Sequence, residues 1–496
     1  MANVAATLRA RYWALSALGL GLVGWQTARG HYATGDFWEH AAAVRELARH
    51  TADPGNPVLA TGDPHAFLSP YALGVALVVK VTSLHHVDVL AAAGLLNYAL
   101  LCAGLWRFVR VFTTAPAAPF YALLFTFLLW GWHPWQYSGF LHLRELGYVA
   151  CYPSTFALAV ALLTAAGADG TLRAAGRRRA TGAALTVLGV TVVVLTHPIA
   201  AVVLLAALAA VGLTAPDRAR AIALLAGSAA AGGLLGLAWP YYPPVDLLGE
   251  QGVYDPSNRV MYEDWLLRTF PALAVIAVLV WPTPTLNRAR LGIYTAVLAA
   301  VFAYGWVSGH WSAGRVIAYL VLGAHIGLAD LASRLEARWR PALRGRRAAF
   351  AAGAAALALG VALLNMAAGF RGTLPGTGDP VPTDHSDHVA AARATPAGSV
   401  VLAPVSYGVE VIPVHGGRLV AAQRPLAFVA DADDRRRAAG AFYDATTTAG
   451  RRRALLRRYR VDYVVVPAGA RPGAFAPLGP VVRRTPGFDV RRIRSR

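Results

Sequence analysis

The chain has 496 residues, of which 56% are hydrophobic and only 15% are charged. A soluble chain would carry about a quarter charged residues, so the composition excludes an ordinary soluble protein and indicates a membrane protein. The net charge of +20 would suggest a nucleic-acid partner in a soluble chain. Here many arginines fall in short loops between apolar runs, where a bilayer explains them, and no recognition motif accompanies them. We therefore expect no nucleic-acid partner.

Apolar runs of about 17–25 residues, the length that crosses the hydrocarbon core of a bilayer, recur along the chain. They predict about eleven spans, at residues 12–28, 87–112, 118–133, 148–166, 182–196, 198–213, 220–240, 266–283, 290–308, 314–332 and 348–370. Residues 69–82 are apolar but short, which suits an interfacial or re-entrant helix better than a span. The first run lacks a small-residue cleavage signal, so we expect a retained signal anchor.

The arginine clusters of the short loops predict the topology. When residues 69–82 are not counted as a span, these clusters fall on one side, which the positive-inside rule identifies as the cytoplasm. We expect a multi-pass protein of the plasma membrane, with its N-terminus in the cytoplasm and its C-terminal domain outside. The loops on the outer side are rich in Trp, Tyr, Pro, His and acidic residues, and they comprise residues 35–65, 133–147, 241–265 and 308–314.

The last 125 or so residues are expected to form a separate soluble domain. Residues 372–382 are dense in Gly, Pro and Thr and predict a linker, which divides the chain into a transmembrane domain (residues 1–370) and a small α/β domain (residues 371–496). The predicted elements of the second domain are a helix at 387–394, a strand at 399–404, short elements at 409–414 and 418–422, a long helix at about 433–459 and a strand at 462–467. This alternation is typical of an α/β fold.

The first outer loop contains residues 35–40, which read Gly-Asp-Phe-Trp-Glu-His. Asp36 and Glu39 lie at the start of a predicted helix, where Asp36 suits an N-cap and Glu39 would complete a capping box. The same two acids suit general-base chemistry at the membrane surface, since a capped helix start holds a carboxylate in place. The two interpretations are compatible, and His40, which follows directly, is a cavity-lining candidate.

A second group of candidates lies near later outer turns. Arg315 follows the loop 308–314 at the end of a span, where an arginine either binds an anion such as phosphate or reaches to the headgroups. His310 in that loop and His197 are candidates to donate to the same phosphate. His197 lies in Thr-His-Pro, which predicts a helix break between two short spans.

Further polar residues have weaker assignments. Arg144 and Glu145 either line the outer cavity that would hold the phosphate or form a local ion pair. Asp63 and His65 are additional cavity-lining candidates. The acids of the long loop 241–265 are expected to be solvated, and they are Asp255, Glu263 and Asp264.

Cofactor chemistry leaves little trace in the sequence. Residues 384–388 read Asp-His-Ser-Asp-His, which suits either a metal site or a solvated helix start; we predict no metal site there. The soluble domain has no glycine-rich phosphate loop, cysteine motif or nucleophile elbow, so we expect a lid or acceptor-guiding module rather than the catalytic part. No nucleotide or redox cofactor is expected, and a divalent cation is left open. Cys102 and Cys151 lie in apolar stretches and are interpreted as core residues.

The order of these features resembles that of the GT-C membrane glycosyltransferases. A first span is followed by an outer loop with Asp36 at the start of a juxtamembrane helix, then by a proline-containing apolar helix at 69–73, many spans and an outer C-terminal domain. The resemblance implies transfer of a sugar, such as mannose or arabinose, from a polyprenyl-phosphate donor with inversion at the anomeric carbon. The implied acceptor is a glycan, lipid or protein of the cell envelope. It assigns Asp36 as the base and Arg315 to the lipid phosphate.

Two alternatives from other classes stay open. A transporter or flippase for a lipid-linked or small polar substrate would also have many spans and broken helices. A noncatalytic envelope scaffold would leave both Asp36 and Arg315 replaceable. The scarcity of charge within the spans and the large outer domain favour the enzyme over the transporter.

Overall fold

A computed structural model describes residues 2–30, 33, 35–249, 254–275, 284–339, 360, 386–405, 410–424, 426–470, 475 and 478–493. The chain divides into two compact units. The helical unit comprises Met1–Tyr32, Ala91–Trp239 and Tyr254–Pro380, and the mixed unit comprises Ala33–Leu90, Pro240–Val253 and Val381–Arg496. The predicted boundary near residue 370 lies outside the described residues. The mixed unit nevertheless includes the first loop (residues 35–65) together with the C-terminal region.

The helical unit contains most of the helices. They are α1 (Ala2–Ala28), α4 (His86–Phe112, whose first residues belong to the mixed unit), α5 (Ala118–Leu128), α6 (Leu143–Val149), α7 (Pro153–Arg173), α8 (Gly176–Thr196), α9 (Pro198–Leu213), α10 (Arg218–Gly236), α12 (Asp255–Asn258), η2 (Arg259–Tyr262), α13 (Trp265–Thr269), η3 (Phe270–Ala274), α15 (Arg288–Ser308), η4 (Trp311–Val316) and α16 (Ile317–Trp339).

Within the described part of the chain, six helices are long and apolar enough to cross a membrane: α4, α7, α8, α10, α15 and the run of η4 and α16. The shorter apolar helices are α3 (Pro70–Thr82), α5 and α9. The protein is therefore a mostly helical, multi-pass membrane protein, as the sequence predicts. The predicted interfacial segment at 69–82 is indeed a single helix of 13 residues.

Several predicted span boundaries were wrong. Helix α5 ends at Leu128, short of the predicted end at residue 133. Helix α7 begins at Pro153 because proline favours the first helical turn, so the predicted span at 148–166 is displaced toward Arg173. The predicted span at 266–283 begins with two short helices, and its residues 276–283 lie outside the described ones, as do residues 348–370 apart from residue 360.

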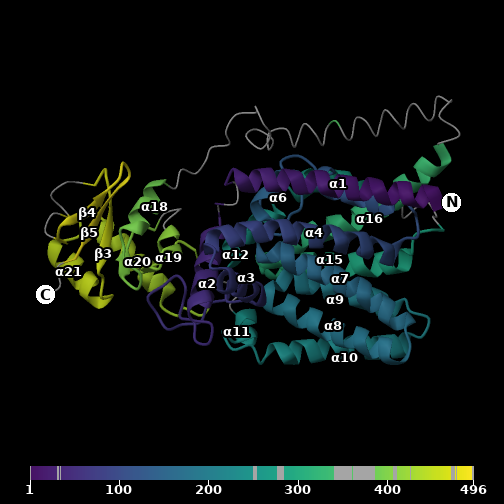
Figure 1. Cartoon of the computed structure of the whole chain (residues 1–496), viewed down its shortest axis with the longest axis horizontal. Helices are drawn as coiled ribbons and strands as arrows, with labels where there is room; N and C mark the ends of the chain where they lie inside the picture. The colour runs from purple at the N-terminus through teal and green to yellow at the C-terminus, as the bar shows by residue number, and fades with distance from the viewer. Residues whose placement is uncertain are drawn as a thin grey trace. The chain divides into compact units, whose positions relative to one another are not determined.

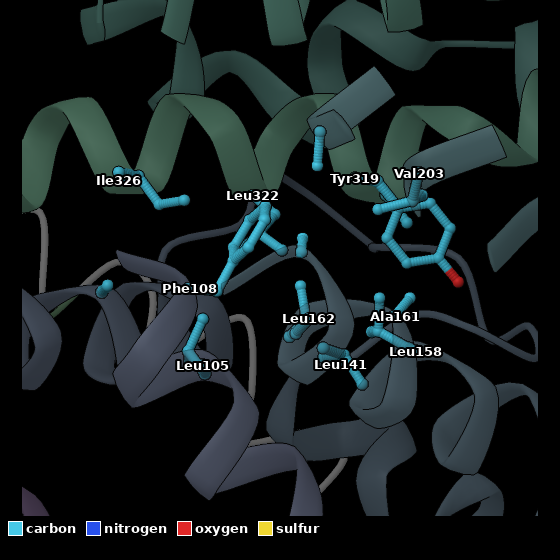
Figure 2. Packing of buried hydrophobic residues seen from close by; sticks show 14 of the residues in the cluster. Leu105, Phe108, Leu141, Leu158, Ala161, Leu162, Val203, Tyr319, Leu322 and Ile326 are labelled. Atoms are coloured by element: carbon cyan, nitrogen blue, oxygen red, sulfur yellow. The ribbon is translucent and has the colours of Figure 1, made fainter. Parts of the chain in front are cut away.

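Helices of the helical unit pack around one apolar core. Helix α7 packs against α8 and α9, and α8 packs against α10 (Figure 1). Helix α5 packs against α16. The core side chains come from segments far apart in sequence, and Figure 2 shows Phe108, Leu162 and Leu322 pointing toward one another. Cys102 and Cys151 are buried free thiols, which confirms the prediction that they are core residues.

The mixed unit combines short helices with one sheet. Its helices are α2 (Phe37–Arg49), α3, α11 (Pro244–Gly249), α18 (Ser386–Arg393), α19 (Val411–Val414), α20 (Ala432–Tyr443) and α21 (Ala449–Arg458). Its strands are β1 (Val400–Leu402), β2 (Arg418–Leu419), β3 (Tyr463–Pro467), β4 (Val481–Arg484) and β5 (Phe488–Arg492). The strand order is β2-β1-β3-β5-β4. Strands β2, β1 and β3 are parallel and β5 and β4 are antiparallel additions, so the sheet is mixed.

The predicted helix at 433–459 was wrong in one respect, because the chain forms two helices there. Asp444 accepts hydrogen bonds from the backbone and hydroxyl of Thr446, which turns the chain after α20. Thr448 then caps α21 by accepting from the backbone N–H of Arg451. Strands β4 and β5 were not predicted, since their Arg-rich sequence lacks the apolar run of a buried strand.

The first loop is joined to the sheet of the mixed unit. Leu59 forms a parallel bridge with Leu419 of β2. The Leu419 N–H donates to the Val58 carbonyl at 2.8 Å, and the Ala60 N–H donates to the Leu419 carbonyl at 3.0 Å. The free edge of β2 is thus paired with the first loop, which fixes residues 58–60 against the segment 410–424.

The packing of the helical unit can be tested at Gly131. A Cβ at Gly131 would lie 2.1 Å from the Leu267 carbonyl oxygen. Since this oxygen and the next nearest atoms, the carbonyl carbon and oxygen of Arg268, all belong to the backbone, we expect Gly131→Ala to lower the free energy of unfolding by about 1–3 kcal/mol. Equilibrium unfolding in mixed detergent micelles measures this. Gly167→Ala in α7, where nothing lies within 4 Å, is the control and should not destabilise; equal losses in both variants would contradict the packing.

Candidate functional site

Three loops of the helical unit contact one another. The Tyr137 hydroxyl donates to the Ser257 carbonyl at 2.9 Å, and the Trp135 indole N–H donates to the Val260 carbonyl at 2.8 Å. The Ser312 N–H donates to Asp255 at 2.7 Å. The loops 133–147, 254–265 and 308–314 therefore form one connected layer, which we call the loop cluster.

Asp255 is an organising residue of the loop cluster. Its side chain accepts from the Ser312 N–H through Oδ1, and its Oδ2 lies 3.4 Å from Nδ1 of His310. The prediction that Asp255 is solvated was wrong, because α12 begins at this residue and turns it inward, leaving it only 8% exposed. Glu263 and Asp264 are exposed, as expected.

Arg315 lies at the end of η4 in the same unit. Its Nη2 donates to the Ser138 carbonyl at 2.9 Å and lies 3.4 Å from Nε2 of His197. The guanidinium also lies over the Tyr137 ring, 5.7 Å from its centroid. Arg315 is half-buried, and no carboxylate of the described residues forms an ion pair with it. The structure thus brings together two of the three residues that the sequence assigns to phosphate, while His310 contacts Asp255.

The position of His197 follows from the helix break. Helix α8 ends at Thr196 and α9 begins at Pro198, as predicted. The Ala200 N–H donates to His197 Nδ1 at 3.3 Å, so the neutral ring carries its proton on Nε2. Since the arginine is also a donor, two donors lie side by side. An anion that accepts from both would stabilise this arrangement.

Glu145 and Arg144 lie on α6. Burial raises the pKa of Glu145 to about 8, and the nearby charge of Arg144 opposes this shift. The suggested local ion pair was wrong, because within the described part of the chain the two side chains do not come within ion-pairing distance. Glu145 is therefore a buried acid of the helical unit.

Asp36 occupies the N-cap position of α2 in the mixed unit. Its backbone is helical and its side chain makes no capping hydrogen bond, so the predicted capping box with Glu39 was wrong. The carboxylate of Asp36 instead forms an ion pair with Arg424. The carboxylate that the local sequence predicts to cap α2 therefore pairs with an arginine from the C-terminal region.

Glu39 and the two histidines of the first loop are buried in the mixed unit. Glu39 is 1% exposed, and burial together with the nearby Glu410 carboxyl raises its pKa to about 8. Burial, with a contribution from His65, lowers the pKa of His40 to about 3. Burial alone lowers the pKa of His65 to about 4. Near neutral pH, Glu39 is mostly protonated and both rings are uncharged.

The remaining candidates have local structural contacts. Asp63 accepts from the Thr61 hydroxyl at 2.7 Å, and His65 Nδ1 accepts from the Phe67 N–H at 3.1 Å. The ring of Phe67 also stacks on His40, with centroids 4.2 Å apart. These contacts shape the first loop.

The acid and histidine run at 384–388 is described only in part, since residues 384 and 385 lie outside the described ones. Asp387 accepts from the Gly487 N–H at 2.7 Å, and the His388 ring lies 4.8 Å from that of Phe488. Across the described residues, no group of three or more His, Cys, Asp and Glu side chains could hold a metal ion. The requirement for a divalent cation stays open.

Sequence reasoning missed three residues that the structure connects to the candidates: Asp255, Glu410 and Arg424. Asp255 precedes a proline at a helix start, a signal for an ordered rather than a solvated residue. For Glu410 and Arg424 there is no local signal, because their significance comes from contacts with the first loop.

Comparison with known proteins shows a structural similarity. The fold resembles the crystal structure of the Archaeoglobus fulgidus oligosaccharyltransferase in its apo form, with a TM-score of 0.50 and 11% sequence identity. The similarity covers 92% of this chain and 69% of that one. No protein-family model and no curated protein matches the sequence. The similarity shows a shared fold.

The buried acid of the first loop makes stability depend on pH. Native Glu39 keeps its proton up to about pH 8, whereas an unfolded glutamate releases it near its ordinary value of 4.5. The stabilising contribution is thus fully present below about 4.5 and is lost as pH rises through about 8. We expect Glu39→Gln to flatten the fall in unfolding midpoint between these pH values. Thermal unfolding of purified protein measures it; Asp53→Asn, exposed in the same loop, should retain the slope. A slope unchanged in Glu39→Gln would contradict the assignment.

Proposed function

We propose that this protein is a membrane glycosyltransferase that moves a sugar from a polyprenyl-phosphate donor to a glycan, lipid or protein acceptor outside the cytoplasm. The fold shared with an oligosaccharyltransferase supports the reaction class. The observation that carries the proposal is the half-buried Arg315 guanidinium beside His197, which together offer donors to a phosphate.

The donor site follows from the charge of the ligand. A sugar phosphate on a polyprenyl chain keeps its tail in the bilayer and its phosphate at the level of the loops. Arg315 lacks a carboxylate partner among the described residues, so an anion restores local neutrality. When the bond between the anomeric carbon and the phosphate oxygen breaks, the phosphate gains negative charge, and both donors stabilise that change.

The acceptor chemistry is assigned to the first loop. Asp36 takes the proton of the acceptor hydroxyl as its oxygen attacks the anomeric carbon from the face opposite the phosphate. The bond from that carbon to the acceptor forms while the bond to phosphate breaks, which inverts the configuration. The donor is already activated by its lipid phosphate, so a nucleotide is not required. The sugar, mannose or arabinose in our proposal, is not specified by these groups.

The base is tested by an isosteric substitution. We expect Asp36→Asn to lower sugar transfer by about 10²–10⁴-fold, since the amide cannot accept the proton. The assay uses purified protein in lipid vesicles with radiolabelled polyprenyl-phosphate mannose or arabinose and a cell-wall acceptor mixture. Asp53→Asn, an exposed acid of the same loop, is the control. Full activity in Asp36→Asn would remove Asp36 from the mechanism, and flipping of the donor without transfer would favour a transporter.

The donor site is tested separately. Arg315→Gln removes a charged hydrogen-bond donor, and we expect kcat/KM for the donor to fall about 10–100-fold. Arg315→Lys should recover part of this loss, because it retains the charge without the planar fork. Arg259→Gln is the control, since Arg259 also lies over an aromatic ring, that of Trp311. Equal effects of the Arg315 and Arg259 variants would contradict a specific phosphate site.

A further inference from the structure

The segment 410–424 lies near the two acids at the start of α2, Asp36 and Glu39. It is anchored to the first loop by the backbone pairing of Leu59 with Leu419. A second anchor is the ion pair between Arg418 and Glu46, with 2.6 Å between Nη2 and Oε2. Glu46 also accepts from the Gly55 N–H at 3.3 Å. Three parts of the mixed unit are thus joined around one carboxylate.

This anchored segment places two ionisable side chains, those of Arg424 and Glu410, near the start of α2. Arg424 forms the ion pair with Asp36, and Glu410, which is 4% exposed, acts electrostatically on Glu39. The pair of Asp36 and Arg424 is partly accessible, with side chains 28% and 33% exposed. Glu39 is buried. Solvent and an acceptor can therefore reach the first acid and not the second.

Burial separates the two acids into different roles. Glu39 lies in a low-dielectric environment beside another carboxyl, which favours its neutral form. His40 and His65 are also neutral for the same reason. Asp36, in contrast, has a positive partner, because Arg424 forms an ion pair with it.

We propose that Arg424 is a positioning residue for Asp36, so that the C-terminal region completes the candidate site. This inference rests on the proposed glycosyltransferase function. Because the Asp36 side chain is not used as a helix cap, the guanidinium fixes its orientation. One carboxylate oxygen is held by Arg424, and the other is left to accept the proton of the acceptor hydroxyl.

The kinetic test compares Arg424→Gln, Arg424→Lys and the control Arg483→Gln, an exposed arginine of β4. The substrate is radiolabelled polyprenyl-phosphate sugar in vesicles. We expect Arg424→Gln to lower kcat about 10–100-fold with little change in donor KM, since a displaced base slows the chemical step. The acid limb of the pH–rate profile should move to higher pH, because the carboxylate loses its positive neighbour. Arg424→Lys should recover part of kcat. A raised donor KM with an unmoved pH profile would overturn the proposal in favour of direct contact with the donor phosphate.

A second measurement does not depend on sugar transfer. Thermal unfolding of wild type, Asp36→Asn, Arg424→Gln and the double variant forms a double-mutant cycle. We expect the double variant to be no less stable than the less stable of the two single variants, because one substitution already breaks the ion pair. Additive losses would show that the pair does not form and would overturn the proposal. Absence of transfer in wild type, with coupling intact, would instead count against the proposed function.

Discussion

The half-buried guanidinium of Arg315 is the feature on which the account depends. A cation at the edge of a hydrocarbon layer is costly unless an acceptor meets it. Within the described residues, Arg315 donates to the Ser138 carbonyl and lies over the Tyr137 ring, which are weak substitutes for a carboxylate, and the ring of His197 lies beside it as a second donor. The helix break at Pro198 places His197 between α8 and α9, with its ring beside the guanidinium. The loop cluster then holds Arg315 from the other side through the Ser138 carbonyl. A phosphate is the ligand class that this combination of donors suits best.

In the mixed unit, burial and neighbouring charges act on two acids, Asp36 and Glu39. Burial favours the neutral form of Glu39, and an arginine forms an ion pair with Asp36. The segment 410–424, which is fixed by backbone pairing with the first loop, supplies Arg424, and its Glu410 adds to the effect of burial on Glu39. The C-terminal region is therefore more than an appended domain, since its side chains set the charge of residues that follow the first helix. Such a division between a neutral and an ionised acid is a common way to prepare one carboxylate for proton transfer.

Sequence reasoning succeeded where a local rule dominates. The break at residues 196–198 and the short helix at 70–82 follow from proline and from run length, and both are present. It failed where distant residues compete with a local rule. Asp36 has the sequence of a helix cap, yet its carboxylate is taken by Arg424. Asp255 reads as a solvated loop acid, yet it accepts from the Ser312 N–H. The sequence around Asp36 does not indicate Arg424 as its partner, and the sequence around Asp255 does not indicate Ser312. Neither partner could therefore be inferred without the fold.

We propose that Arg315 and His197 bind the phosphate of a polyprenyl lipid. The most direct measurement uses a polyprenyl phosphate with a photoreactive diazirine in its first isoprene unit, crosslinked to the protein in vesicles and mapped by mass spectrometry. The account predicts labelling of peptides that contain residues 133–147, 197 and 308–316. This labelling should be displaced by unlabelled polyprenyl phosphate and lost in Arg315→Gln. Labelling spread over the lipid-facing helices, unchanged by competitor and by the substitution, would contradict it.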